Sequence, residues 1–177
     1  MKKKVLITVL AAVLLVALAV GGTLAWLTDT ASVTNVFTLG DVKISLDEEN
    51  WVPNSKIVPG AEIAKDPVVT VEANSEECYV FVEIDVPAAM AAISSIDIDS
   101  TNWLKLDGED NVYYYKTTVA SSTSAQALPA VFTEVTISED ATNAQIAAIG
   151  TENSIIVTAY AIQATAGDTP ALAWAAL

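Results

Sequence analysis

Histidine and arginine are absent from this 177-residue sequence, and cysteine occurs once. Without histidine, a Ser-His-Asp triad, a Cys-His dyad and a histidine-ligated zinc site are all impossible. Without arginine, the usual bidentate clamp for phosphate and carboxylate groups is missing. The single cysteine, Cys78, has no partner for an internal disulfide. We expect it to be a buried apolar side chain, with a bridge between two chains as the alternative.

Positive charge is scarce as well. Eight lysines stand against 22 acidic residues, which gives a formal net charge of −14. Three of the lysines occupy positions 2–4, so residues 26–177 hold five lysines and all 22 acidic side chains, a formal charge of −17. Such a surface repels phosphate backbones and anionic membranes, so we expect no nucleic-acid partner.

The first 25 residues show the order of features that is typical of an export signal. Lysines 2–4 precede an apolar run from Val5 to Val20, and Thr23-Leu24-Ala25 supplies the small residues of a cleavage site. The sequence therefore predicts a signal peptide over residues 1–25, cut between Ala25 and Trp26, and a secreted chain that meets the membrane only before cleavage. A retained membrane anchor is the alternative, because about 20 apolar residues can span a bilayer.

Strand patterns dominate the rest of the chain, which is long enough for one domain. The predicted strands cover residues 42–46, 67–73, 78–86, 103–106, 112–115, 131–137 and 154–164. Polar loops join 67–73 to 78–86 and 103–106 to 112–115, so we expect two hairpins. Residues 154–164 are apolar on both faces, as a central strand of a sandwich would be. Tyrosines 113–115 must point to both faces of a strand, so at least one should be exposed or meet a partner.

Helical patterns are fewer and shorter. Residues 87–95 and 140–149 each predict a short helix, and Thr169 with Pro170 offers an N-cap and a first-turn proline for the apolar tail. We therefore predict an all-β fold, an antiparallel, jelly-roll-like β-sandwich over residues 41–177 with one or two short helices. A signal-peptide helix precedes this domain.

Acidic side chains cluster in two predicted turns. The clusters contain Asp97, Asp99, Asp107, Glu109 and Asp110. Carboxylate oxygens suit calcium, although neither cluster has the spacing of an EF-hand loop. The alternative is that these are solvated turn carboxylates without a metal. Calcium is the only cofactor for which the sequence offers candidate ligands, and we predict no catalytic residue.

Several short segments together resemble a known family. They are residues 22–29 (GTLAWLTD), residues 35–40 (NVFTLG) with the strand that follows, and Val58-Pro59-Gly60-Ala61-Glu62 with Lys65-Asp66. The chain resembles the TasA/camelysin family, secreted proteins of Gram-positive bacteria whose leader is removed by the dedicated signal peptidase SipW. The resemblance implies a jelly-roll-like subunit of extracellular biofilm-matrix filaments, located in the matrix or at the cell surface. Its implied partners are further copies of itself, head to tail, the SipW-type peptidase and an accessory matrix protein.

The same resemblance gives residues 26–40 a role as an N-terminal donor strand for the next subunit. This segment is apolar and β-prone, and its candidate assembly side chains are Leu27, Val33, Val36 and Phe37. A strand from a neighbour can satisfy the unpaired backbone groups of an incomplete sheet, and head-to-tail contacts that do not close produce fibres. The alternative is that residues 26–38 form an edge strand of their own subunit.

Two other functions stay open from the sequence. The camelysin branch of the family is described as metalloprotease-like, which implies a secreted, metal-dependent peptidase. The absence of histidine makes a zinc peptidase a poor chemical fit. The second alternative is a monomeric cell-surface β-module that does not polymerise.

Overall fold

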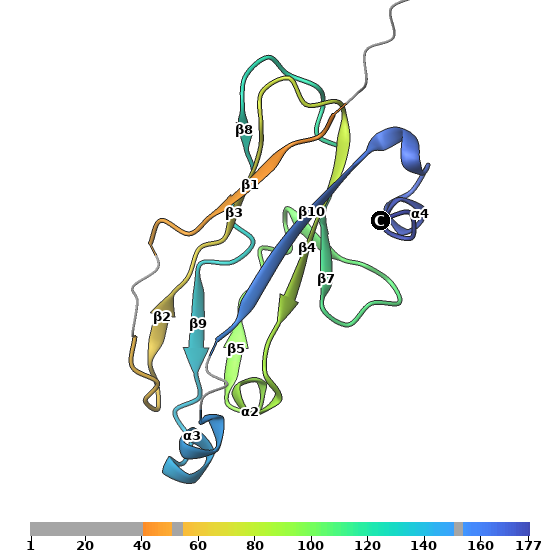
Figure 1. Cartoon of the computed structure of the whole chain (residues 1–177). Coiled ribbons are helices and arrows are strands. Elements are labelled where there is room, and N and C mark those ends of the chain that lie inside the picture. Colours follow the sequence, from red (N-terminus) through yellow and green to blue (C-terminus); the bar gives the residue numbers. More distant parts are fainter. Residues whose placement is uncertain (1–40, 51–54, 151–153) are drawn as a thin grey trace, which may run out of the picture. The chain divides into compact units, whose positions relative to one another are not determined.

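Antiparallel strand pairing organises the chain into three sheets in the computed structural model (Figure 1). The structure describes residues 41–50, 55–150 and 154–177, all of which belong to one compact unit, Leu39–Leu177. The predicted signal peptide, its cleavage site and the segment 26–40 lie outside the described residues and stay predictions. The antiparallel, all-β class expected from the sequence is confirmed, and the sheets are consistent with a sandwich.

The strand order defines the three sheets. Sheet A contains β1 (Ile44–Asp47), β3 (Val68–Val71) and β8 (Gln126–Ala127), in that order. Sheet B contains β2 (Glu62–Ala64), β9 (Glu134–Ile137) and β5 (Ser94–Ile96). Sheet C contains β10 (Ile156–Gln163), β4 (Cys78–Asp85), β7 (Val112–Tyr115) and β6 (Trp103–Lys105).

The helices are short. They are α2 (Ala88–Ala91), α3 (Asn143–Ile149), α4 (Pro170–Trp174) and the 3-10 helix η1 (Ala164–Ala166). Thr142 caps α3 in a capping box with Gln145, and Thr169 caps α4 by accepting a hydrogen bond from the Leu172 amide at 3.3 Å. Thr169 is the cap that the sequence predicts, whereas α3 begins at Asn143, inside the helix predicted over residues 140–149. Within the described residues, no helix has both the length and the apolar character needed to cross a membrane.

Sheets A and B form one bent layer of the sandwich. The connection between β2 and β3 runs beside the connection between β8 and β9, and backbone hydrogen bonds join the two. The Lys65 amide donates to Thr133 O at 3.1 Å, and the Val131 amide donates to Pro67 O at 2.9 Å. Pro67 has no N–H, which explains why the regular ladder is interrupted there. All three sheets contribute side chains to one main core, so sheet C is the second layer.

Alternation along β4 separates two apolar clusters. Val80, Val82 and Ile84 point into the main core, as the sequence predicts. Phe81 on the opposite face is fully buried in a second cluster beneath α4. Tyr113 and Tyr115 pack against the main core and Tyr114 against the second cluster, and all three are half-buried. The partner that the tyrosines meet is therefore the domain itself.

The first predicted hairpin is wrong. Strands β3 and β4 follow one another closely, but β3 lies in sheet A and β4 in sheet C. Both strands bury alternate valines in the main core from opposite layers, so the chain crosses between layers at residues 72–77. Asn74 takes the left-handed conformation there, with φ 63°. The second predicted hairpin is confirmed, with β6 and β7 paired around a turn that contains Gly108 at φ 90°.

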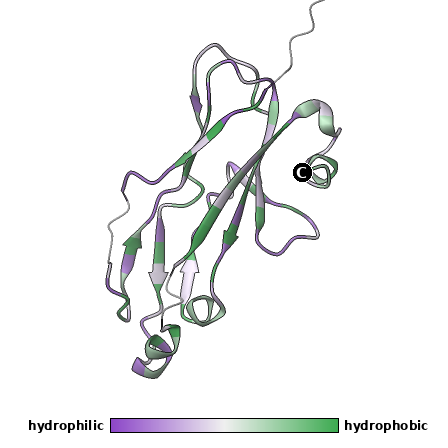
Figure 2. Cartoon of the chain, viewed as in Figure 1, coloured by the Kyte–Doolittle hydropathy of each residue, from purple (hydrophilic) through white to green (hydrophobic). Residues whose placement is uncertain are grey.

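The predicted central position of residues 154–164 is also wrong. Strand β10 is an edge strand of sheet C, and its only strand partner among the described residues is β4 (Figure 1). Its apolar character along most of its length (Figure 2) has a different cause. One face packs on the main core and the other lies in the second cluster with α4. An apolar sequence pattern indicates that both faces of a strand are covered by other side chains. It does not indicate whether the strand has hydrogen-bonded neighbours at both of its edges.

Helix α4 packs so closely on the loop before it that Gly167 has no room for a side chain. A Cβ at this position would lie 2.7 Å from the Ala173 amide nitrogen. We expect Gly167→Ala to displace α4 and to lower the free energy of unfolding by about 1–3 kcal/mol. Denaturant titration followed by tryptophan fluorescence measures the loss of stability. The exposed neighbour Ala166→Ser is the control, and an unchanged midpoint for Gly167→Ala would show that α4 yields freely.

Candidate functional site

Two strand edges lie side by side where the layers of the sandwich meet. The Cα atoms of β1 and β10 come within 8 Å of each other, yet among the described residues no hydrogen bond joins the two strands (Figure 1). Both strands pack alternate side chains on the main core. We call this region the β1–β10 seam and define it by Ile44, Leu46, Val157, Ala159 and Ala161.

The pairing of β10 with β4 fixes which backbone groups face the seam. The Ala164 amide donates to Glu77 O at 2.8 Å, in register with the ladder between the two strands. In an antiparallel ladder alternate residues bond to the same neighbour, so the even-numbered residues of β10 bond to β4. The odd-numbered residues direct their N–H and C=O groups into the seam. They are Val157, Ala159, Ala161 and Gln163.

The edge of β1 has the same arrangement. The Glu72 amide donates to Lys43 O at 2.8 Å, which extends the β1–β3 ladder and assigns Ser45 and Asp47 to bonding with β3. Ile44 and Leu46 therefore turn their backbone groups toward β10. Backbone donors and acceptors face the seam from both sides, and groups of this kind cost free energy when they are buried without a partner.

Elsewhere in the sandwich, a side chain forms a hydrogen bond between the two layers. Trp103 at the start of β6 is 1% exposed, and its indole Nε1 donates to Pro129 O in the opposite layer at 3.0 Å. Its ring meets Tyr115 edge to face at a centroid distance of 5.5 Å. No comparable side-chain bridge spans the seam within the described chain.

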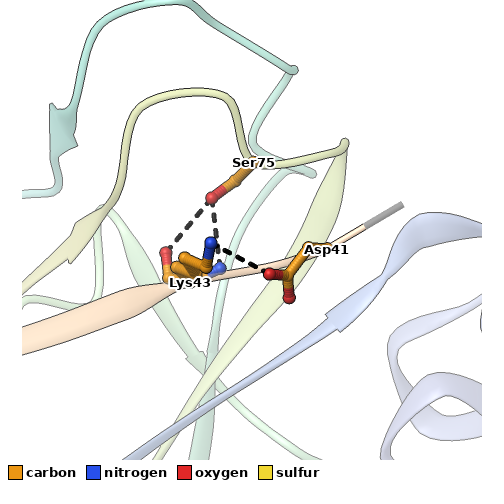
Figure 3. Close-up of polar contacts among 3 residues, drawn as sticks. All are labelled: Asp41, Lys43 and Ser75. Carbon is orange, nitrogen blue, oxygen red and sulfur yellow. Dashed lines mark hydrogen bonds and ion pairs between the residues drawn. The ribbon is translucent and has the colours of Figure 1, made fainter. Parts of the chain in front are cut away.

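The described chain enters the domain at one end of the seam, and a buried serine fastens it there (Figure 3). Ser75 Oγ accepts a hydrogen bond from the Lys43 amide at 3.1 Å and donates to Lys43 O at 3.2 Å. The Glu76 amide donates to Asp41 O at 3.0 Å. The ion pair between Lys43 Nζ and Asp41 Oδ2 is 3.0 Å long but mostly exposed, so it contributes little.

This anchor places Asp41, the first residue of the domain that the structure describes, near the end of β10. Glu76 binds Asp41 through its amide, and the following residue, Glu77, binds Ala164 at the end of β10 through its carbonyl. The point where residue 40 joins the domain therefore lies at the end of the seam. The predicted donor residues Leu27, Val33, Val36 and Phe37 belong to the segment before this point and lie outside the described residues.

The family-like motif Lys65-Asp66 fixes the connection between β1 and β2. Lys65 Nζ bonds to Glu48 Oε1 at 2.5 Å in a largely buried ion pair. Asp66 accepts hydrogen bonds from the Asn50 amide at 2.9 Å and from Asn50 Nδ2 at 2.6 Å. The motif thus holds the chain that leaves β1, a role that the sequence alone did not reveal.

Two of the five predicted calcium ligands, Asp99 and Glu109, accept hydrogen bonds from other side chains. Asp99 accepts from Asn102 Nδ2 at 2.7 Å and from the Thr101 amide at 3.1 Å, and these bonds, that of Asn102 foremost, lower the pKa of its carboxyl group. Asp107, Glu109 and Asp110 lie in the β6–β7 turn, where Glu109 Oε1 accepts from Trp174 Nε1 at 3.3 Å. Asp97 follows β5. The described residues contain no group of three or more acidic or cysteine side chains that could hold a metal ion.

Two further titratable groups, Cys78 and Tyr160, have raised pKa values because of their surroundings in the fold. Cys78 is fully buried, as expected, and burial together with the nearby charge of Glu77 raises the pKa of its thiol to about 11. A thiol of this kind is unreactive, so the folded chain offers no bridge to another chain. Tyr160 donates to Glu83 Oε2 at 3.0 Å, and this hydrogen bond raises the pKa of its hydroxyl group.

Comparison with known proteins gives one match. Residues 1–83 match the family model described as camelysin metallo-endopeptidase. The resemblance to the TasA/camelysin family is thereby confirmed. No curated protein and no solved structure matches the chain. The part of the match that the structure describes contains the Ser75 anchor, the Lys65-Asp66 motif and the crossing from β3 to β4.

The metal that the family description implies does not fit the residues of this chain. A peptidase zinc ion is held by histidine and carboxylate ligands, and the sequence contains no histidine. No cluster of acidic side chains replaces the missing ligands within residues 41–50, 55–150 and 154–177. The residues of the described domain therefore do not fit a histidine-ligated peptidase zinc ion.

Ser75 provides a test of the anchor. The side chain is 4% exposed and bonds to both backbone groups of Lys43. We expect Ser75→Ala to lower the free energy of unfolding by about 1–3 kcal/mol, because it removes the hydrogen-bond partner of the Lys43 amide. Hydrogen exchange should rise at residues 42–46 before it rises in β4. Asp41→Asn, which removes only the exposed ion pair, is the matched control, and equal effects of both variants would contradict this role for Ser75.

Proposed function

We propose that this chain is a secreted structural subunit, not an enzyme, which polymerises into extracellular filaments of a biofilm matrix. Each subunit donates residues 26–40 to the β1–β10 seam of the next. The observation that carries the proposal is the juxtaposition of the seam with the point where that segment joins the domain. The TasA/camelysin resemblance supports it, since that family is typically extracellular or surface-associated.

A strand that pairs in the seam gains a substantial free energy of association. Four residues of β10 direct one N–H and one C=O each toward it: Val157, Ala159, Ala161 and Gln163. A backbone hydrogen bond contributes about 0.5–1.5 kcal/mol net, so a fully paired strand gains several kcal/mol before its ordering cost. Apolar side chains that enter the edge of the main core add to this gain.

Insertion also requires the seam to widen. Neighbouring strands in a sheet lie about 4.8 Å apart, so a strand between β1 and β10 needs about 9.6 Å. The Cα atoms of the two strands approach within 8 Å in the single subunit. Strand β1 must therefore move away from β10 during assembly, which makes the first contact between subunits slow.

The donor and acceptor surfaces differ, so the contact is heterologous. A subunit that has filled the seam of its neighbour still presents its own seam to a third copy. Contacts of this type continue into a filament unless the rotation between subunits closes a ring. A monomeric surface module is the alternative, and it predicts that the seam stays empty or takes the chain's own segment.

A complementation experiment tests donation between subunits. The donor-less variant begins at Asp41, and the acceptor-blocked variant is Ala159→Pro in a chain that begins at Trp26. Proline at position 159 removes an N–H that faces the seam and leaves the bonds to β4 intact. We expect each variant alone to be monomeric by light scattering, and an equimolar mixture to form a heterodimer that grows no further.

The controls decide between the alternatives. The chain that begins at Trp26 without substitution should polymerise. Thr158→Pro removes an N–H that binds β4, so it should destabilise the fold far more than Ala159→Pro. Failure of the donor-less variant to fold would assign residues 26–40 to their own sheet. Chelator-sensitive casein cleavage by the polymerising sample would instead revive the peptidase.

Salt should strengthen assembly. Residues 26–177 carry five lysines and 22 acidic side chains, so neighbouring subunits repel one another. The Debye length falls from about 10 Å at 0.1 M salt to about 3 Å at 1 M. We expect the critical concentration for polymerisation, measured by sedimentation, to fall as sodium chloride rises over this range. An unchanged critical concentration would show that the acidic surfaces lie far from the contacts.

A further inference from the structure

Strand β1 is fastened to the rest of the domain at both of its ends. Where the chain enters, Ser75 Oγ bonds to the backbone N–H and C=O of Lys43. Where the chain leaves, Lys65 Nζ pairs with Glu48 in a largely buried ion pair. Between these two points the ladder with β3 covers the whole strand. The contacts at the ends therefore extend the attachment of β1 beyond its regular ladder.

The backbone hydrogen bonds of β1 lie across the strand, because those of an antiparallel pair run perpendicular to its axis. The residues that bond on this side are Asp41, Lys43, Ser45 and Asp47. A pull along the strand axis strains all of these bonds at once. A sideways pull at one end breaks them one after another. Strand β1 therefore resists an axial pull more strongly than a sideways pull.

The domain has two ends along its strands, which we call the entry end and the far end. Asp41 and Ala164 both lie at the entry end, where they bond to the adjacent residues Glu76 and Glu77. Strand β4 begins at this end and finishes with Asp85 at the far end, where α2 follows it and packs on α3 (Figure 1). A pull between Asp41 and the far end is thus directed along β1. A pull between Asp41 and Ala164 is directed across it.

We propose that β1 and its end contacts form a mechanical clamp, which protects the domain when the chain before residue 41 is pulled away from the far end. Such a pull enters the domain at Asp41 and meets the bonds of β1 first. Cysteine occurs once, so no internal disulfide shares the load, and hydrogen bonds and packing must carry it. Filaments of the proposed function transmit tension by this route, but the clamp acts whether or not the chain polymerises.

Pulling on single molecules in two directions tests the clamp, at a dilution that prevents polymerisation. One handle is the N-terminus of the chain that begins at Trp26. The other is a cysteine at an exposed position, Asp85→Cys at the far end or Thr165→Cys at the entry end. The natural Cys78 is fully buried, so the introduced thiol takes the handle. At equal force we expect the Asp85→Cys molecule to unfold at least about tenfold more slowly, since several bonds must break together.

Two core variants separate the clamp from overall stability. Ser75→Ala removes a contact of β1, whereas Trp103→Phe removes the hydrogen bond to Pro129 O elsewhere in the sandwich. Both should lower the free energy of unfolding at equilibrium. In the far-end direction we expect Ser75→Ala to accelerate forced unfolding by about 5- to 150-fold, because it removes a bond that resists the pull. Trp103→Phe should leave this rate nearly unchanged.

Three outcomes contradict the clamp. Equal unfolding rates in the two directions reject it, and this comparison needs no core substitution, so it decides the question even if Ser75→Ala fails to fold. An unchanged rate for Ser75→Ala in the far-end direction assigns the resistance to another strand. Equal acceleration by Trp103→Phe shows that the rate follows overall stability. Since polymerisation is not measured here, loss of the clamp leaves the proposed function standing, and a chain without filaments can still possess the clamp.

Discussion

An antiparallel strand needs hydrogen-bond partners on both of its sides, and β10 has one on a single side among the described residues. The rest of the domain is arranged around this constraint. Helix α4 and the main core cover the two faces of β10, so its side chains are packed while one row of backbone groups stays without a strand partner. Strand β1 lies alongside with the same deficiency, and together they form the β1–β10 seam.

Periodicity in the sequence predicts the faces of this fold well and its edges poorly. The alternation of Val80, Val82 and Ile84 correctly assigns one face of β4 to the main core. The cap residue Thr169 correctly marks a helix start, because capping is a local interaction. Hydrogen-bonded neighbours are set by the tertiary fold. The pairing of β3 and the edge position of β10 were therefore predicted wrongly, since two covered faces leave the same pattern in central and edge strands.

Within the range that matches the camelysin family model, the Lys65-Asp66 motif and Ser75 have structural roles. Lys65 and Asp66 hold the chain that leaves β1, and Ser75 holds the chain that enters it. Both sets of contacts hold β1 in place. In the proposed assembly, the separation of β1 from β10 determines whether a donor strand can enter the seam. These roles depend on contacts between residues 16 to 32 positions apart in the sequence, so the motif could be recognised but its purpose could not be derived.

In the proposed assembly, a subunit with an incomplete sheet edge must avoid premature pairing, and the features that protect it also set the barrier to assembly. Strand β1 lies too close to β10 for a third strand, so the exposed length of edge is short until β1 moves. The strong negative charge keeps copies apart before specific contact. In the proposed assembly the donor segment overcomes both when it pairs with the backbone groups of the seam. The predicted cut between Ala25 and Trp26 then acts as the switch, because before cleavage that segment is joined to a membrane-held leader.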